Sequence, residues 1–388
     1  WFYFQRNIRY SYEKYKDKLD IFHVAFSGGK DSAVLLDLVR KALPKGSFIV
    51  IFGDTGMEFP DTYEAVEHTR RLCEAEGTPF YVARSHFDPH ESWKLFGPPA
   101  RVLRWCCSVH KSTPQTIKMR EILGKDNYTG MDFVGVRKEE SLARSQYQFE
   151  SYGKKQKGQY SFNPILEWTS AEVWLYIFAN NLYVNAAYKK GNSRAGCLFC
   201  PMSGGQADYF RYYNYKEDID TYIDLIKDSY SASDSKSIES YVVNGGWAAR
   251  NNGRNLKNNP FRCIENFTNS ELVIKVINPL NDWKEWIKTL GDLSVVSDRY
   301  IIRFLGQDIE FNVKEDDSGY IVNIKESILK QFPKFSRLFR QVFRKAAYCG
   351  ACRVCEINCK NGSLKFENGK VKITNCIHCF QCHEIDDG

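Results

Sequence analysis

The sequence predicts an α/β fold, a parallel sheet with helices on both faces, followed by smaller domains. Short apolar runs at 21–26, 48–52 and 80–83 alternate with helical patterns that begin at Asp31 and Asp61. Repeated strand–helix units of this length form parallel sheets. The chain has 388 residues, which is too long for one ordinary domain. Many of its cysteines gather near the C-terminus, which indicates a cysteine-rich domain there.

The remaining elements of the first domain follow from local patterns. Residues 1–19 are charged and aromatic at helical spacing, so we expect a helix packed outside the core. The run 133–136 predicts the fourth strand. Thr169 and Glu172 form a capping-box pattern, which predicts the start of a helix. Residues 208–230 are rich in aromatic side chains and are expected to be helical.

The second half of the chain divides by composition. Residues 233–259 are rich in Ser, Asn and Gly and predict a linker. Strand patterns follow it, with Asp317-Ser318-Gly319 as a hairpin turn. The predicted organisation is an N-terminal helix at 1–20, an α/β domain at 21–232, a linker at 233–259, a small α+β unit at 260–345 and a cysteine-rich domain at 346–388.

Composition narrows the class of protein. The formal net charge of +7 permits a nucleic-acid or nucleotide partner without demanding one. No run approaches 18 consecutive apolar residues and no leader pattern opens the chain, so we expect a soluble, cytoplasmic protein with no membrane partner. The thirteen cysteines cluster in a long chain, which favours metal binding over a disulfide framework.

The strongest local signal is the string Ser27-Gly28-Gly29-Lys30-Asp31-Ser32, between a predicted strand and a predicted helix. Two glycines let the backbone turn tightly, and the amide groups of the loop and of the helix N-terminus then form an anion site. Lys30 adds a positive charge for phosphate. The string is not a Walker A loop, which needs Gly-x-x-x-x-Gly-Lys-Ser/Thr. It predicts a phosphate-binding loop of another kind.

With this loop the chain resembles the PP-loop ATP pyrophosphatases, whose signature is Ser-Gly-Gly-x-Asp-Ser, and among them the branch of the PAPS reductases. Further strings that carry the resemblance are 52–60 (FGDTGMEFP), 104–107 (RWCC), 134–141 (VGVRKEES) and 163–165 (NPI). The resemblance covers residues 21–202, roughly half of the chain. It implies an adenine nucleotide alpha hydrolase-like fold, and an enzyme that cleaves ATP to AMP and pyrophosphate and transfers AMP to a substrate oxygen.

The resemblance also implies roles for single residues. The ATP-binding positions it implies are Ser27, Gly28, Gly29, Lys30, Asp31, Ser32, Asp54, Thr55 and Arg137. Those expected to be catalytic are Lys30, Asp31, Asp54 and Arg137. Asp54 and Thr55 end the second strand and are candidates for the nucleotide or for Mg²⁺, which is expected because charge builds on the departing pyrophosphate. Arg137 could neutralise a phosphate in the transition state. Arg144 is a weaker candidate, equally well explained as a solvated surface residue.

Four cysteines within this domain form a first group, Cys106-Cys107 and Cys197-x-x-Cys200. Their arrangement resembles the 4Fe–4S ligands of bacterial APS reductases. Four thiolates also suit zinc, although adjacent cysteines are unusual for structural zinc. We therefore expect a 4Fe–4S cluster here, with zinc and then free thiols as the alternatives.

Seven C-terminal cysteines form a second group. The first run, Cys349, Cys352, Cys355 and Cys359, has ferredoxin spacing, with Lys360 where a proline is usual; the second run is Cys376, Cys379 and Cys382. In two-cluster ferredoxins the fourth cysteine of one run serves the other cluster. Cys359 would then complete the cluster of the second run. The first run needs another fourth ligand, and the equivalent position holds Asp386. Either Asp386 substitutes for a cysteine, or that cluster is incomplete or absent. Zinc knuckles are the alternative.

These parts together predict a sulfurtransferase. PAPS and APS reductases carry a C-terminal Glu-Cys-Gly-x-His segment, and no such string occurs in this sequence. The fusion of the PP-loop core to a cysteine-rich tail resembles the DNA phosphorothioation sulfurtransferases of the DndC and SspD type. That resemblance implies DNA as substrate, a cysteine desulfurase as sulfur donor and other DNA-modification proteins as partners. A tRNA thiolation enzyme, an assimilatory APS/PAPS reductase and a nucleotide-binding scaffold are the alternatives.

A DNA groove would need cations and aromatic groups near the loop. The candidates are Arg101, Arg104, Lys111, Lys154, Lys155, Lys157, Arg194, Tyr209, Phe210, Tyr212 and Tyr213. The alternative reading is a solvated loop beside a core aromatic stripe.

Overall fold

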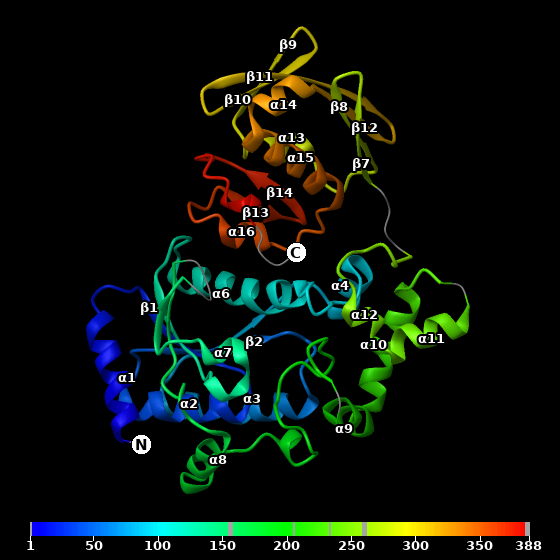
Figure 1. The fold of residues 1–388 in the computed structure, drawn as a ribbon. Helices are drawn as coiled ribbons and strands as arrows, with labels where there is room; N and C mark the ends of the chain where they lie inside the picture. The colour runs from blue at the N-terminus through cyan, green and yellow to red at the C-terminus, as the bar shows by residue number, and fades with distance from the viewer. Residues whose placement is uncertain (1, 154–157, 205, 233, 258–261, 385–388) are drawn as a thin grey trace. The chain divides into compact units, whose positions relative to one another are not determined.

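The computed structural model describes residues 2–153, 158–204, 206–232, 234–257 and 262–384 (Figure 1). It separates into two compact units, Trp1–Asn255 and Leu256–Gly388, each with its own core. Within the described residues, no helix combines the length and the apolar character needed to cross a membrane.

The first unit is built on a six-stranded sheet with the order β3-β2-β1-β4-β6-β5. The strands are β1 (Ile21–Phe26), β2 (Ile49–Asp54), β3 (Phe80–Arg84), β4 (Gly130–Phe133), β5 (Glu150–Tyr152) and β6 (Tyr160–Phe162). All neighbours are parallel except β5 and β6. The chain order runs outward from β1 in both directions. In open α/β sheets, ligands bind beyond the carboxyl ends of the strands at such a reversal. The expected parallel sheet is confirmed.

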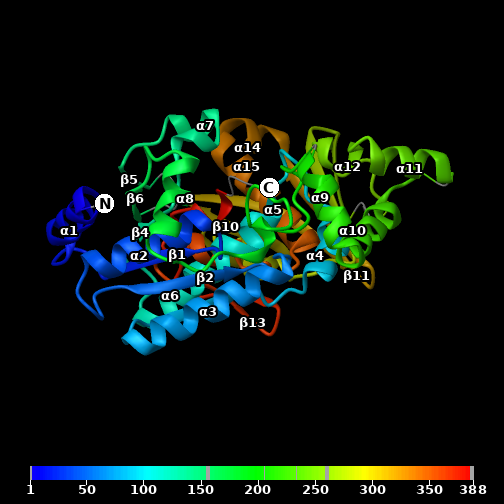
Figure 2. The same cartoon turned by 90° about the horizontal axis from the view of Figure 1, so that it is seen from below.

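Helices cover both faces of this sheet (Figure 2). One face packs against α1 (Phe2–Tyr15), α2 (Lys30–Ala42), α3 (Pro60–Glu76) and α8 (Ser170–Ala179), and a single apolar core joins them to the strands. The other face packs against α6 (Thr113–Leu123) through a smaller core. The remaining elements of the unit's middle part are α4 (Pro89–Phe96), α5 (Trp105–Cys107), α7 (Leu142–Ser145) and the short turns η1 (Ser108–Ser112), η2 (Lys138–Glu140) and η3 (Ala186–Tyr188).

The fourth strand lies earlier than expected. Residues 133–136 were expected to form it, but β4 ends at Phe133. A Cβ atom at Gly135 would lie 2.8 Å from the Asp31 carbonyl oxygen, so the backbone there runs against the start of α2 instead of continuing in the sheet. Arg137 consequently follows a loop, and this loop brings it toward the phosphate string.

The end of the first unit holds four helices, α9 (Gln206–Asn214), α10 (Lys216–Ser229), α11 (Ser235–Val243) and α12 (Gly246–Ala249). The expectation of helix over 208–230 holds, with a break at Tyr215. The expectation of a linker over 233–259 is wrong for α11 and α12. Tyr241 is buried and stacks on Tyr230 with ring centroids 3.9 Å apart. A few well-placed apolar residues thus anchor a segment whose overall composition is that of a loop.

The second unit contains a six-stranded antiparallel sheet with the order β7-β8-β12-β11-β10-β9. Its strands are β7 (Cys263–Thr268), β8 (Glu271–Ile277), β9 (Asp292–Val296), β10 (Arg299–Phe304), β11 (Gln307–Asp316) and β12 (Gly319–Lys325), and its helices are α13 (Trp283–Ile287), α14 (Glu326–Gln331) and α15 (Pro333–Tyr348). The cysteine-rich part adds α16 (Val354–Asn358), the hairpin β13 (Leu364–Glu367) and β14 (Lys370–Ile373), and the turn η4 (Gln381–His383). One apolar core joins both segments.

Candidate functional site

The phosphate loop connects β1 to α2. Gly28 adopts φ +70°, and a Cβ atom there would lie 2.7 Å from Thr62 Cγ2, so both the conformation and the space require glycine. Ser32 Oγ donates to the Gly29 carbonyl at 2.9 Å and accepts from Ser27 N–H at 3.2 Å. Asn185 Nδ2 donates to the Gly28 carbonyl at 3.0 Å. The N-cap Gly29 offers no side chain to the first turn of α2. The loop therefore has the form of an anion site.

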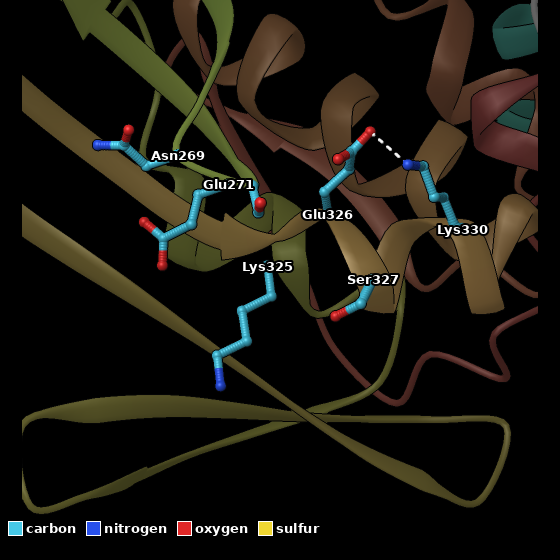
Figure 3. Close-up of a pocket in the computed structure, with 7 residues that line it drawn as sticks. Asn269, Glu271, Lys325, Glu326, Ser327 and Lys330 are labelled. Atoms are coloured by element: carbon cyan, nitrogen blue, oxygen red, sulfur yellow. Dashed lines mark ion pairs between the residues drawn. The ribbon is translucent and has the colours of Figure 1, made fainter.

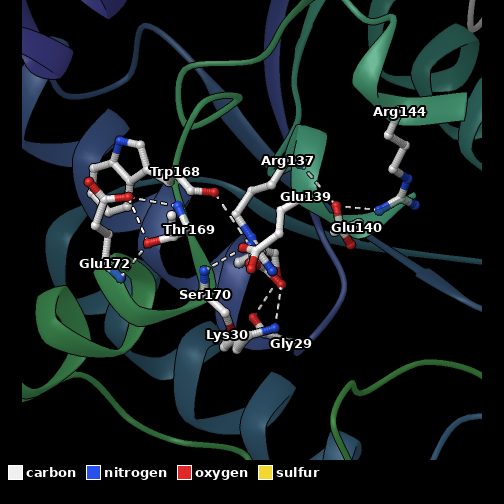
Figure 4. A network of polar contacts seen from close by, with 12 residues as sticks. Gly29, Lys30, Arg137, Glu139, Glu140, Arg144, Trp168, Thr169, Ser170 and Glu172 are labelled. Carbon is white, nitrogen blue, oxygen red and sulfur yellow. Dashed lines mark hydrogen bonds and ion pairs between the residues drawn. The ribbon is translucent and has the colours of Figure 1, made fainter. Parts of the chain in front are cut away.

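Asp31 is held between two cations at the start of α2. Lys30 Nζ lies 3.0 Å from Asp31 Oδ2, and Arg137 Nε donates to Asp31 Oδ1 at 2.6 Å (Figure 4). Arg137 is buried and also donates from Nη1 to Glu139 Oε2 at 2.7 Å. Burial alone would lower the pKa of Arg137, but the charge of Asp31 and its hydrogen bond outweigh it, and the pKa is raised. Arg137 thus remains a cation directly beside the loop.

A network of polar contacts extends from Arg137 to the start of α8 (Figure 4). Glu139 Oε2 accepts from Ser170 N–H at 2.7 Å, and Glu140 Oε2 accepts from Arg137 N–H at 2.9 Å. Arg144 pairs with Glu140 and not with Asp31. Arg144 therefore belongs to the outer part of this network, in line with its weaker candidacy.

Asp54 lies at the carboxyl end of β2 and is held by three neighbours. Its Oδ1 accepts from Gly56 N–H at 2.8 Å and from Tyr63 Oη at 2.9 Å, and its Oδ2 lies 3.4 Å from Arg84 Nη1. Burial and then the Asp54 charge raise the pKa of Tyr63. Thr55 Oγ1 donates to Glu58 Oε1 at 2.8 Å. Oδ1 is committed to two donors, so Oδ2 is the oxygen of Asp54 that a nucleotide or Mg²⁺ could reach.

The first cysteine group draws together from distant parts of the unit. Glu58 forms an antiparallel β-bridge with Cys197, and Cys106 lies in α5. Hydrogen bonding with Cys107, burial and the nearby thiols of Cys197 and Cys200 all raise the pKa of Cys106. These four thiols therefore share one neighbourhood. Burial first, and then Glu58, raise the pKa of Cys197.

Metal binding is not shown by the geometry. Throughout the described part of the chain, no group of three His, Cys, Asp or Glu side chains is arranged so that it could hold a metal ion. Among the described cysteines, none is joined to another by a disulfide bond. The assignment of Cys106, Cys107, Cys197, Cys200 and the C-terminal cysteines as cluster ligands stays a prediction.

The backbone of the two C-terminal runs has the same unusual conformation at matching positions. Ala351 and Arg353 in the first run, and His378 and Phe380 in the second, all have φ between 53° and 65°, at matching positions. Non-glycine residues rarely adopt this conformation, and such outliers gather at functional sites. Here they curl each run, and His378 N–H points to Cys376 Sγ at 3.4 Å.

The thiols of the two C-terminal runs influence one another. Burial first raises the pKa of Cys382 to about 12, and the nearby thiols of Cys355, then Cys376 and Cys359, add to the shift. Cys359 Sγ also accepts from Leu364 N–H at 3.4 Å. Thiols of both runs therefore lie near one another, and the assignment of Cys359 to the second run stays a prediction. Asp386 lies outside the described residues.

The predicted DNA groove is described only in part. Tyr209 and Tyr213 are 67% and 76% exposed and stack with ring centroids 6.5 Å apart, so they are not core residues. Arg101 Nε donates to the Pro201 carbonyl at 3.3 Å. Lys154, Lys155 and Lys157 lie outside the described residues. Whether this surface binds DNA stays a prediction.

Several residues at the loop carried no recognisable signal in the sequence. Asn185 and Tyr188 reach it from η3 and contact Gly28 and Lys30. Glu58 accepts a hydrogen bond from Thr55, and it lies in the string 52–60, in which only Asp54 and Thr55 were predicted to be site residues. Only the folded chain brings residues so far apart in sequence together.

A hollow in the second unit has no comparable chemistry (Figure 3). Its lining residues are Asn269, Ser270, Glu271, Lys325, Glu326, Ser327 and Lys330. Glu326 pairs with Lys330 at 2.9 Å. Within this lining, neither a cysteine nor a histidine is present, and the site described above in the first unit remains the candidate.

Comparison with known proteins also points to the first unit. Residues 21–203 match the phosphoadenosine phosphosulfate reductase domain. The chain is 36% identical over 201 residues to an uncharacterized protein of Methanocaldococcus jannaschii, across 50% of this chain and 38% of that protein. It is 30% identical over 209 residues to an adenosine 5'-phosphosulfate reductase of Halalkalibacterium halodurans, across 51% of this chain and 81% of the relative. A solved PAPS reductase of Candida auris is 20% identical, with a TM-score of 0.37, across 49% of this chain and 87% of that one.

The phosphate loop and the strand order of the first sheet both lie within the residues that match the family. The chain spans 38% of the length of the Methanocaldococcus jannaschii protein. Through residues 21–203, the chain belongs to the phosphoadenosine phosphosulfate reductase family.

Proposed function

We propose that this protein is a PP-loop ATP pyrophosphatase that activates a substrate oxygen for replacement by sulfur. The observation that carries the proposal is the glycine loop at the start of α2, whose N-cap residue Gly29 has no side chain, with Asp31 fixed between Lys30 and Arg137. Such a loop suits the two terminal phosphates of ATP, and Lys30 and Arg137 would compensate the charge that develops on them.

The proposed reaction has two displacements. A substrate oxygen attacks the α-phosphorus of ATP, an O–P bond forms, the bond to the bridging oxygen breaks, and pyrophosphate leaves with the electron pair. A sulfur nucleophile then attacks the activated atom, and AMP leaves with the oxygen. Asp54 Oδ2 and Thr55 are the residues that would hold Mg²⁺, an ion that prefers oxygen ligands and neutralises phosphate charge.

For the substrate we propose the DNA backbone. A non-bridging phosphate oxygen would be adenylated, and the terminal sulfur of a cysteine desulfurase persulfide would attack the DNA phosphorus. A thiol would then cleave the S–S bond and be oxidised to a disulfide, leaving the phosphorothioate. The net positive charge and the exposed Tyr209 and Tyr213 support a nucleic-acid partner.

The C-terminal cysteines are proposed to hold one or two 4Fe–4S clusters. Cys376, Cys379, Cys382 and Cys359 would ligate one, and Cys349, Cys352 and Cys355 would contribute to another. Cys106, Cys107, Cys197 and Cys200 are proposed to hold a cluster in the first unit. Such clusters carry single electrons.

A second candidate is an assimilatory reductase acting on a ready-made sulfonucleotide. The name of the Halalkalibacterium halodurans relative favours it. In that reaction ATP would not be cleaved, so the two candidates differ in a measurable product.

The deciding experiment is pyrophosphate release from ATP by protein purified without oxygen. We expect release by the natural sequence and a loss of at least about a hundredfold in Asp31→Asn, because Lys30 and Arg137 lose the carboxylate that positions them. The control is Asp224→Asn, which alters an exposed pair with Lys227 in the same unit. Turnover of APS without pyrophosphate release would favour the reductase.

The DNA assignment has its own measurement. Isotope-labelled cysteine, a desulfurase, ATP and DNA are incubated with the protein, and the DNA is digested and searched for labelled phosphorothioate. Label in tRNA but not in DNA would move the proposal to tRNA thiolation.

A further inference from the structure

The hydroxyl group of Tyr188 lies against the phosphate loop. Tyr188 closes the turn η3, and its Oη accepts from Lys30 N–H at 2.9 Å and from Ala195 N–H at 3.4 Å. A Cβ atom on Gly29 would lie 3.3 Å from this oxygen. The hydroxyl is therefore at the N-terminus of α2, where phosphate oxygens are expected.

The two hydrogen bonds leave the hydroxyl with one unused capacity. A phenolic oxygen accepts through its lone pairs and donates through a single hydrogen. Both bonds of Tyr188 use it as acceptor, and in the described part of the chain no acceptor is found for its hydrogen. Burial above all raises the pKa of Tyr188 to about 12, so that the hydrogen stays in place at neutral pH. Two N–H donors on the oxygen also polarise the O–H bond and make it a stronger donor.

The ring is held in one orientation by its neighbours. Trp174 of α8 meets it edge to face with ring centroids 5.3 Å apart, and Lys30 Nζ lies 5.6 Å from its centroid. A donor that is fixed before the ligand arrives loses little entropy on binding.

We propose that Tyr188 is a phosphate-binding residue, which donates its hydroxyl hydrogen to the pyrophosphate portion of ATP while its oxygen holds the loop amides. The proposal rests on the proposed function, because it assumes that this loop receives the two terminal phosphates. It adds an uncharged donor, from a segment far along the chain, to the cations Lys30 and Arg137.

The test is the affinity of Tyr188→Phe for ATP, inorganic pyrophosphate and AMP, each measured by calorimetry with Mg²⁺. We expect a loss of at least about tenfold for ATP and pyrophosphate, which is the effect of one hydrogen bond to a charged group, and no loss for AMP. The control is Tyr176→Phe, which removes a buried hydroxyl that donates to Asp37 at 2.6 Å elsewhere on α2. Equal affinity, or tighter binding because the hydroxyl blocks the loop, would overturn the proposal.

A second variant separates donation from support of the loop, because phenylalanine removes both. Replacement of Tyr188 by 3-fluorotyrosine makes the hydroxyl a stronger donor and its oxygen a weaker acceptor. Donation to phosphate predicts tighter pyrophosphate binding, measured below the pH at which the fluorinated group ionises. Weaker binding would mean that the hydroxyl only supports the loop, and would overturn the proposal.

Failure of the underlying function looks different. If the unsubstituted protein binds neither ATP nor pyrophosphate, the proposed function falls, and the inference falls with it. If the unsubstituted protein binds both and Tyr188→Phe binds them equally well, only the role of Tyr188 is wrong.

Discussion

At the scale of single residues, the phosphate loop depends on positions where one side chain, or none, is tolerated. Gly28 combines a positive φ with contact to Thr62, and Asp31 meets two cations within 3.0 Å. The carboxylate of Asp31 offsets charge that would otherwise repel within the loop, and it orients Lys30 and Arg137. The loop is therefore ordered before any ligand is present.

Gly28→Ala is expected to destabilise the first unit and weaken ATP binding. An alanine in the left-handed region lowers the free energy of unfolding by about 1–2 kcal/mol. The close contact of its Cβ atom with Thr62 Cγ2 adds a steric cost to this loss. Adding Thr62→Ser removes Cγ2 but keeps the hydroxyl that accepts from Asn185. Denaturant unfolding should show partial recovery in the double variant. Equal losses with and without Thr62→Ser would contradict the steric term.

At the scale of elements, a rare π-helical turn follows the adjacent cysteines. The turn η1 begins at Ser108, directly after Cys107, and π-helical turns are frequent at functional sites. His110 of this turn is buried, and its Nε2 lies 2.8 Å from Ser92 Oγ of α4. This contact links the turn to α4.

His110 makes the stability of the first unit depend on pH. Burial lowers its pKa from 6.5 to about 4, so between these values the unfolded chain binds a proton that the folded chain does not. The free energy of unfolding should fall as the pH is lowered through this window, by up to about 3 kcal/mol. His110→Gln should remove this part of the pH dependence, measured by denaturant unfolding from pH 7 to 4. The control His68→Gln, whose ring stacks on Tyr183, should keep it; an unchanged profile in His110→Gln would contradict the assignment.

At the scale of the whole molecule, the two units divide the chemistry. The first unit holds the phosphate loop and the first cysteine group, and the second unit builds its cysteine runs into the same core as its antiparallel sheet. Cys355, Cys359 and Cys382 all belong to that core. Loading of a cluster in the second unit should therefore stabilise the whole unit.

Cys359→Ser is expected to remove one cluster, about four iron atoms, from protein reconstituted without oxygen. It should also lower the unfolding temperature of the second unit, because bound metal contributes to folding free energy. The control is Cys263→Ser, in β7 of the same unit and outside both runs. Iron content and calorimetry of both variants give the answer. Equal iron in the two variants would show that Cys359 is not a ligand.

The parallel sheet, the phosphate loop and the capping box at Thr169 could all be predicted from the sequence, and the spacing of the C-terminal cysteines is visible in it directly. Each of these depends on neighbours within a few residues, where periodicity, glycine and cysteine spacing act directly. The average composition of residues 233–259 predicted a linker, but this segment contains α11 and α12.

Which distant residues meet at the loop follows from the packing of the folded chain and not from any local pattern. Arg137 reaches Asp31 because Gly135 lets the chain leave the sheet after β4, and Tyr188 reaches Lys30 from a turn beyond α8. Such contacts depend on how helices and strands pack, and packing joins residues whose separation along the chain carries no local pattern. The residues of the phosphate loop can therefore be identified from the local sequence, whereas the distant residues that complete the site can be identified only from the fold.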